Sequence, residues 1–183
     1  TAGLEMIALM LDIKPGDEII LPSYTFISTA NAFLLRGACL VFVDSCDDNP
    51  NLDVHQLESK ITDKTKAVIA VHYAGIANKP DEIAALCKKH NIYFIEDAAQ
   101  GINAKYKDQY LGSFGDFAVI SFHETKNIHC GEGGLLIINN TKHIDAAYEI
   151  LDKGSNRRAF INGLVNKYEW MRLGSSYGLS ELN

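Results

Sequence analysis

Apolar and polar residues alternate along the chain with two different periods. Leu4, Ile7, Ala8 and Leu11 are spaced three or four residues apart, which predicts a helix over residues 1–12. The same spacing, together with Gly and Pro stop signals, predicts further helices over residues 25–35, 54–61, 80–90 and 143–151.

Short apolar runs between these helices predict strands at residues 18–21, 39–43, 67–71, 92–95, 117–121 and 135–138. Several runs are apolar throughout, which is typical of strands covered on both faces, and the run at 39–43 is predicted to be buried. The segment "KYKDQYLG" predicts a hairpin. Residues 153–178 are predicted to form a long loop, and residues 179–182 to open another helix.

The regular alternation of strands and helices predicts an α/β fold with three layers, in which helices cover both faces of a mainly parallel sheet. Ligands of such sheets bind at the carboxyl ends of the strands. The candidate positions are therefore the residues that follow each apolar run: Asp44, His72, Tyr73, Asp97 and residues 121–126.

Composition narrows the classes of function. The chain has 183 residues, enough for one domain, and its 47% hydrophobic content can form a sizeable core. A net charge of −6 disfavours a nucleic-acid or membrane-surface partner, and no apolar run has the length of a membrane span. The four cysteines lack metal-site spacing, so no metal is predicted; free thiols indicate a reducing compartment, the cytoplasm.

Lys126 lies in the polar stretch "FHETKN", directly after an apolar run. Most such lysines are solvated loop residues. The alternative is an amine held beside a ligand, where a lysine can act as a nucleophile. Asp97 follows another apolar run and is open to two interpretations, a helix cap or an acid that pairs with a cationic ring nitrogen.

Together, a lysine amine and an acid at neighbouring strand ends indicate pyridoxal phosphate, which needs both. The cofactor also needs a phosphate cradle, for which a helix start with hydroxyl groups is suitable. Thr1, Ala2 and Gly3 open the first predicted helix, and Ser121 ends the strand before Lys126.

Several motifs occur in order and at the spacing of one family. The chain resembles the sugar aminotransferases of the DegT/DnrJ/EryC1/StrS family, within the fold-type I, aspartate aminotransferase-like superfamily. The resemblance covers nearly the whole chain. It is carried by "PSYTFISTANAFLLRGA" (22–38), "VHYAG" (71–75), "EDAAQG" (96–101), "SFHETKN" (121–127) and "GEGG" (131–134).

The resemblance implies a role for each matching position. Lys126 would bind pyridoxal 5′-phosphate covalently and act in catalysis, and Asp97 would pair with the pyridine nitrogen. Gln100 would donate to the phenolic oxygen of the cofactor, and Phe26 would stack on its ring. The phosphate would be held by Thr1, Ala2 and Ser121. His72, Tyr73 and His123 would line the substrate pocket, although packing roles are an equal alternative for them.

The implied reaction moves an amino group from L-glutamate to the 4-keto carbon of a nucleotide-linked 4-keto-6-deoxyhexose. The segments "HETKN" and "KYEWMRLGSSY" resemble the branch that makes dTDP-4-amino-4,6-dideoxygalactose for cell-surface polysaccharide. The family also implies a homodimer. Residues 1–183 would form the cofactor-binding large domain, without an N-terminal segment and a small C-terminal domain, and we expect a longer natural protein.

One position departs from the family pattern. Ser176 stands where many members have an Asn that reaches the phosphate of the partner subunit's cofactor. Three alternatives remain at this point. A sugar dehydratase of the same family is disfavoured by the presence of Lys126, and an ordinary nucleotide-binding domain by the absence of a GxGxxG motif or P-loop. A fragment or a regulatory protein without catalysis is the third.

Overall fold

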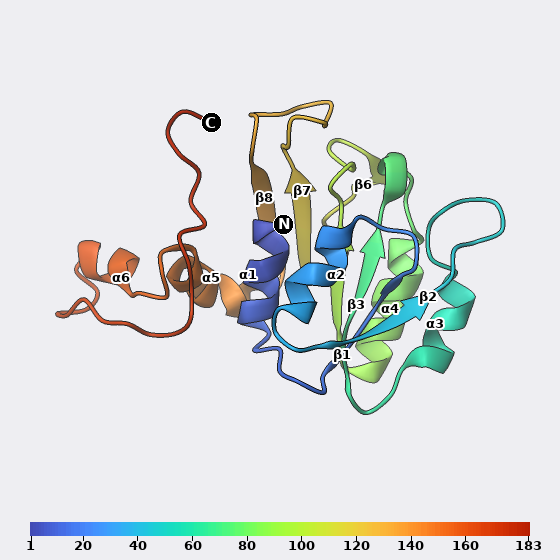
Figure 1. Ribbon diagram of the computed structural model, residues 1–183, viewed down its shortest axis with the longest axis horizontal. Coiled ribbons are helices and arrows are strands. Elements are labelled where there is room, and N and C mark those ends of the chain that lie inside the picture. The colour runs from blue at the N-terminus through green and yellow to red at the C-terminus, as the bar shows by residue number, and fades with distance from the viewer.

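The computed structural model describes all of residues 1–183 and consists of a six-stranded sheet between two layers of helices (Figure 1). Five neighbouring strands are parallel and the last, at one edge, is antiparallel. The prediction of a three-layer fold with a mainly parallel sheet is confirmed. In spatial order the strands are β2 (Cys39–Val43), β1 (Glu18–Pro22), β3 (Thr65–Val71), β4 (Tyr93–Asp97), β7 (Phe117–Ser121) and β8 (Gly134–Ile138).

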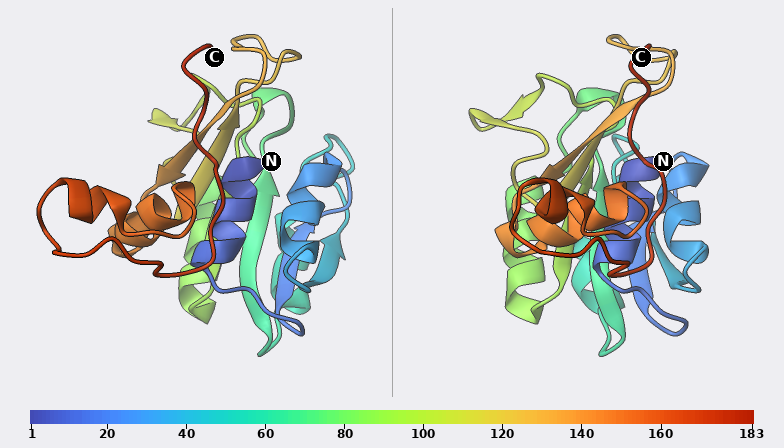
Figure 2. Two further views of the ribbon diagram at one scale, coloured as in Figure 1. Left: turned by 60° about the vertical axis from the view of Figure 1, so that its left-hand side comes forward. Right: turned by 90° about the vertical axis from the view of Figure 1, so that its left-hand side faces the viewer.

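Helices cover both faces of the sheet (Figures 1 and 2). One face packs against α1 (Ala2–Met10), α2 (Ile27–Leu34) and α5 (Ile144–Leu151) in a core of 18 buried residues. The other packs against α3 (Val54–Lys60) and α4 (Pro80–His90) in a core of nine. Two cores of this kind require strands that are apolar on both faces, as the sequence indicated.

Local signals explain why the helices begin where they do. The Asp53 carboxylate accepts a hydrogen bond from the backbone N–H of His55 at 3.0 Å and so caps α3. Pro80 occupies the first turn of α4, where no backbone donor is needed, and α4 has the predicted bounds. Helix α2 begins two residues later than predicted. Thr25 and Phe26 therefore lie in the extended turn between β1 and α2.

One strand differs from the expectations in an informative way. The strand at residues 39–43 was predicted to be buried, but β2 is the edge of the sheet and Phe42 is half exposed. Periodicity cannot distinguish an edge strand from a central one when both are apolar. The predicted hairpin is present as β5 (Lys105–Tyr106) and β6 (Gln109–Tyr110).

The segment predicted as a long loop has structure of its own. It contains α6 (Arg157–Ile161), and residues 171–177 cross the end of α5 closely at Gly154. Gly154 has a φ of +77°, and a Cβ there would meet the backbone carbonyl of Arg172, so a side chain is excluded. The predicted helix over residues 179–182 is absent, and this stretch forms a turn.

Figure 2 shows this C-terminal arm running past α5 toward the loop that follows β7. The Asn183 amide donates there to the backbone carbonyls of Cys130 and Glu132. No helix of the structure combines the length and the apolar character needed to cross a bilayer. The cysteines are all free thiols, and no group of three His, Cys, Asp or Glu residues is arranged to hold a metal ion.

Candidate functional site

The candidate site lies at the carboxyl ends of the central strands. Asp97 is the last residue of β4 and pairs in register with Val71 of β3 and Val119 of β7. It is only 6% exposed, and strands flank it on both sides. Burial inside a continuous sheet holds its backbone rigidly, which suits a carboxylate that must meet a ligand in one orientation.

The Asp97 carboxylate is held at both of its oxygens. Thr29 Oγ1 donates to Oδ2 at 2.7 Å, and the backbone N–H of Ala99 donates to Oδ1 at 3.2 Å. A carboxylate has about four acceptor positions, so two remain. Asp97 is not a helix cap, because no helix follows β4.

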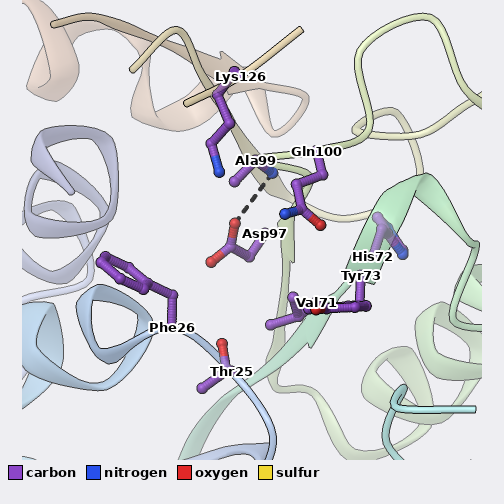
Figure 3. A pocket seen from close by; sticks show the side chains of 9 residues that line it. All are labelled: Thr25, Phe26, Val71, His72, Tyr73, Asp97, Ala99, Gln100 and Lys126. Carbon is purple, nitrogen blue, oxygen red and sulfur yellow. Dashed lines mark hydrogen bonds between the residues drawn. The ribbon is translucent and has the colours of Figure 1, made fainter. Parts of the chain in front are cut away.

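Asp97, Lys126, Gln100 and Phe26 line one small cavity of about 70 Å³. Figure 3 shows the Lys126 amine and the Asp97 carboxylate pointing into the same space. Lys126 belongs to the loop after β7 and donates its backbone N–H to the carbonyl of His123 at 2.9 Å. The Phe26 ring is 73% exposed at the cavity's edge, because this residue precedes α2 and packs against no core.

A second, larger cavity of about 1200 Å³ includes the same four residues and extends to the start of α1. Thr1, Ala2 and Ser121 line this part of it, and the Thr1 and Ser28 hydroxyls are 2.7 Å apart. No side chain caps α1. Its first backbone N–H groups are therefore free to bind an anion, which the helix dipole favours.

Gln100 is oriented by the turn after β3. The backbone N–H of Ala74 donates to Gln100 Oε1 at 2.6 Å, which leaves the NH₂ group of the side chain to donate into the cavity. Ala74 has a φ of +53°, rare for a residue with a side chain, so the turn holds a strained residue at this contact.

The structure changes the interpretation of His72. Its side chain has no exposed area. Nε2 is 2.9 Å from Glu96 Oε2, and Nδ1 accepts the backbone N–H of Asn78 at 3.2 Å. The accepting Nδ1 places the proton on Nε2. Both ring nitrogens are thus engaged within the fold, although His72 is one of the residues that line the smaller cavity, and its role toward a substrate stays a prediction.

Tyr73 and His123, the other two predicted substrate residues, both reach the larger cavity. Tyr73 also lines the smaller one and packs edge-on against Tyr24, with ring centroids 5.1 Å apart. The two hydroxyls are 3.4 Å apart. His123 is half-buried, and its Nδ1 is 2.9 Å from Thr125 Oγ1. Ser176 lines neither cavity and instead forms a bridge with Asp152 beside α5.

Glu96 was not singled out from the sequence, although it is a completely buried carboxylate next to Asp97. In addition to the contact with His72, it accepts three backbone N–H groups at 2.7 to 2.9 Å, from Gly112, Phe114 and Gly115. Burial alone would raise the pKa of Glu96, but the hydrogen bonds from His72 and the backbone outweigh it and lower the pKa.

Sequence reasoning also missed the polar groups that support the site: Tyr24, Thr25, Ser28 and Thr29. A usable signal existed, because Thr25 and Thr29 are four residues apart at the start of a predicted helix and therefore share a face. For Glu96 the signal was a charged residue at a position that strand alternation places in the core.

Comparisons with known proteins identify the family of the chain. The sequence profile described as the DegT/DnrJ/EryC1/StrS aminotransferase family matches residues 1–183. The GDP-perosamine synthase of Escherichia coli O157:H7 is 35% identical over 184 residues, which are 100% of this chain and 50% of that protein. The chain thus spans about half the length of the curated relatives it matches.

Solved structures of aminotransferases superpose closely on this chain. The aminotransferase from Psychrobacter cryohalolentis superposes with a TM-score of 0.90 at 32% identity, over 98% of this chain and 47% of that one. The PLP form of the Streptococcus pneumoniae protein Spr1654 superposes with a TM-score of 0.82 at 28% identity, over 94% of this chain and 48% of that one.

Proposed function

Because the chain belongs to the DegT/DnrJ/EryC1/StrS aminotransferase family, we propose that it forms the cofactor-binding part of an aminotransferase that uses pyridoxal 5′-phosphate. A single observation carries the proposal. Lys126 is the only lysine that lines either cavity, and it shares the smaller one with a buried acid, Asp97. These are the two groups that the cofactor's chemistry requires.

The residues of the cavity fit the cofactor. Asp97 has free acceptor positions for the ring nitrogen, and Gln100 has a free NH₂ group for the phenolic oxygen. The exposed Phe26 ring offers a face for stacking. The uncapped start of α1, with the hydroxyls beside it, suits the phosphate; the residues concerned are Thr1, Ala2, Ser28 and Ser121.

Asp97, Lys126 and Gln100 would each have a separate role in the reaction. Bound pyridoxal phosphate withdraws electrons from the carbon that carries the transferred amino group. Asp97 would keep the ring nitrogen protonated, since a buried carboxylate stabilises a nearby positive charge. Lys126 would hold the cofactor through Nζ, and its free amine would act as the base that takes the proton from the donor's α-carbon. Gln100 would orient the ring by donating a hydrogen bond to it.

We propose a nucleotide-linked 4-keto-6-deoxyhexose as acceptor and L-glutamate as donor, with dTDP-4-amino-4,6-dideoxygalactose as the product. The "HETKN" and "KYEWMRLGSSY" segments support this sugar. The E. coli relative is named for a GDP-linked product, which supports a nucleotide-linked substrate. Tyr73 and His123 line the cavity in which the acceptor would lie. We further propose a homodimer in the natural protein, in which the partner subunit would add residues to the open side of the larger cavity.

The first test uses the natural protein that contains this chain. With pyridoxal phosphate it should turn yellow and bleach when L-glutamate is added. Lys126→Ala should lose the yellow form and lower transamination by at least about 10²–10⁴-fold, the contribution of a general base. Lys88→Ala is the matched control, because Lys88 is exposed on α4 and lines neither cavity.

Two outcomes contradict the proposal. Activity that persists in Lys126→Ala would show that Lys126 is neither the cofactor's attachment point nor the general base. A colourless protein that never takes up cofactor would point to the alternative without catalysis. The sugar is tested separately, by incubating the protein with L-glutamate and dTDP- or GDP-linked 4-keto-6-deoxyhexoses and determining the configuration of the product at C4.

A further inference from the structure

Two hydroxyl groups at the start of α2 form a hydrogen-bonded chain that ends on Asp97. Thr25 Oγ1 donates to Thr29 Oγ1 at 2.9 Å, and Thr29 Oγ1 donates to Asp97 Oδ2 at 2.7 Å. Thr29 is 1% exposed and lies in the first turn of α2, and Thr25 lies in the extended turn just before the helix, close enough for the two hydroxyls to meet. These two hydrogen bonds link α2 to the end of β4, and Thr29 and Asp97 are 68 residues apart in the sequence.

The direction of this chain is fixed by proton count. A hydroxyl has one proton to donate, and the Thr29 oxygen already accepts from Thr25. The Thr29 proton is therefore directed to the Asp97 carboxylate, and a hydrogen bond to a charged acceptor is about twice as strong as a neutral one. Accepting from Thr25 polarises Thr29 further.

The chain also restricts rotation of the carboxylate. Thr29 holds Oδ2 from the side of α2, and the N–H of Ala99 holds Oδ1 from the turn after β4. With both oxygens fixed from different elements, the plane of the Asp97 carboxylate is set before any ligand arrives. Removing the Thr29 hydroxyl would leave one oxygen without a donor in a buried position.

We propose that Thr29 is a positioning residue for the cofactor. Its hydroxyl fixes the Asp97 carboxylate in the orientation that pairs with the ring nitrogen of pyridoxal phosphate, and Thr25 supports it. The inference rests on the proposed function and deepens it, because it makes the acid's effectiveness depend on a second residue that holds its carboxylate in place.

The test compares Thr29→Val, which keeps the shape and removes the hydroxyl, with Thr29→Ser, which restores it. Thr65→Val is the matched control. Thr65 is 5% exposed and also contacts a carboxylate, since its Oγ1 lies 3.4 Å from Glu18 Oε2, but it is at the opposite end of the sheet. All variants are made in the natural protein and loaded with pyridoxal phosphate labelled with ¹⁵N in the ring.

The readout is the ¹⁵N chemical shift of the ring nitrogen as a function of pH, which reports its protonation directly. In Thr29→Val the ring nitrogen should lose its proton about one pH unit lower than in the wild type, and kcat should fall about tenfold with KM little changed. Thr29→Ser and Thr65→Val should titrate like the wild type, and Thr25→Val should shift in the same direction by less.

The proposal is overturned if Thr29→Val titrates like the wild type, or if Thr65→Val shifts as much. If Thr29→Val does not fold, as judged from its melting transition, the Thr25→Val variant decides in the same way. Failure of the proposed function is a different result: there the wild type itself shows no bound cofactor, and both proposals fall together.

Discussion

Glu96 and Asp97 are neighbours on β4, yet strand geometry sends them to opposite faces of the sheet. Glu96 lies on the side of α4, is fully buried, and meets four donor groups, His72 Nε2 and three backbone N–H groups. Asp97 lies on the side of α2, is nearly as buried, and has two. The two carboxylates share a strand and differ in the number of donors each receives.

That difference separates a carboxylate whose acceptor positions the fold fills from one that can still bind a ligand. A carboxylate offers about four acceptor positions, and the fold itself fills all of them on Glu96. On Asp97 half of them stay open, and a cavity lies in front of them. Burial alone would have ranked the two residues equally, so the unused hydrogen-bonding capacity is the property that marks the site.

The largest effect should come from Asp97→Asn, which removes the charge and keeps the shape. We expect transamination to fall by about 10²–10³-fold, the usual cost of losing one electrostatic contact in an active site. The melting temperature should change little, because the amide oxygen can still accept from Ala99 and the Thr29 hydroxyl, unlike a backbone N–H, can rotate to accept from the new NH₂ group. Steady-state kinetics and thermal unfolding of the same preparation would measure both quantities.

The opposite result is expected for Glu96→Gln. The new NH₂ group faces backbone donors, so at least one buried N–H loses its acceptor and the protein should lose about 3 kcal/mol of stability. Activity per folded molecule should remain near the wild-type value. Urea unfolding provides the free energy and an active-site titration the folded fraction. A Glu96→Gln variant as stable as the wild type would refute the assignment.

The smallest effect concerns pH. The pKa of Glu96 in the folded state lies below its ordinary value of 4.5, because its hydrogen bonds outweigh burial. The stability that it contributes is therefore complete above the unfolded pKa and is lost as pH falls through the folded pKa. Unfolding free energies from about pH 5 to about pH 3 should decline less steeply in Glu96→Gln than in the wild type. Equal slopes would contradict this prediction.

Much of the fold was accessible from the sequence, because it depends on periodicity and on turn residues. Pro80 marked the start of α4, and alternating strands and helices indicated the parallel sheet. The edge position of β2 was not accessible, since order within a sheet is set by contacts between distant segments. The predicted helix over residues 179–182 is absent, and the residue after it, Asn183, donates to Cys130 and Glu132, contacts that the local sequence does not reveal.

The residues of the candidate site also fall into those that the sequence predicted and those that it did not. Lys126, Asp97 and Gln100 followed from motifs, and the structure places them around one cavity. For His72 the sequence left packing and pocket lining as equal alternatives, because its partner, Glu96, becomes visible only once two strands are paired. Thr29 escaped notice because a threonine in an apolar helix resembles ordinary packing until its proton acceptor, 68 residues away, is known.

The arrangement of parallel strands has a consequence for refolding kinetics. Thr29 follows β1, Asp97 ends β4 and Lys126 follows β7, and these parallel strands are joined only through long crossovers. Such non-local pairing forms slowly, because loop-closure entropy is lost before the contacts compensate for it. No early, locally folded species can hold all three residues in place. The yellow colour of bound cofactor should therefore appear late in refolding, after β1, β4 and β7 have paired into the sheet, and its rate should report that step.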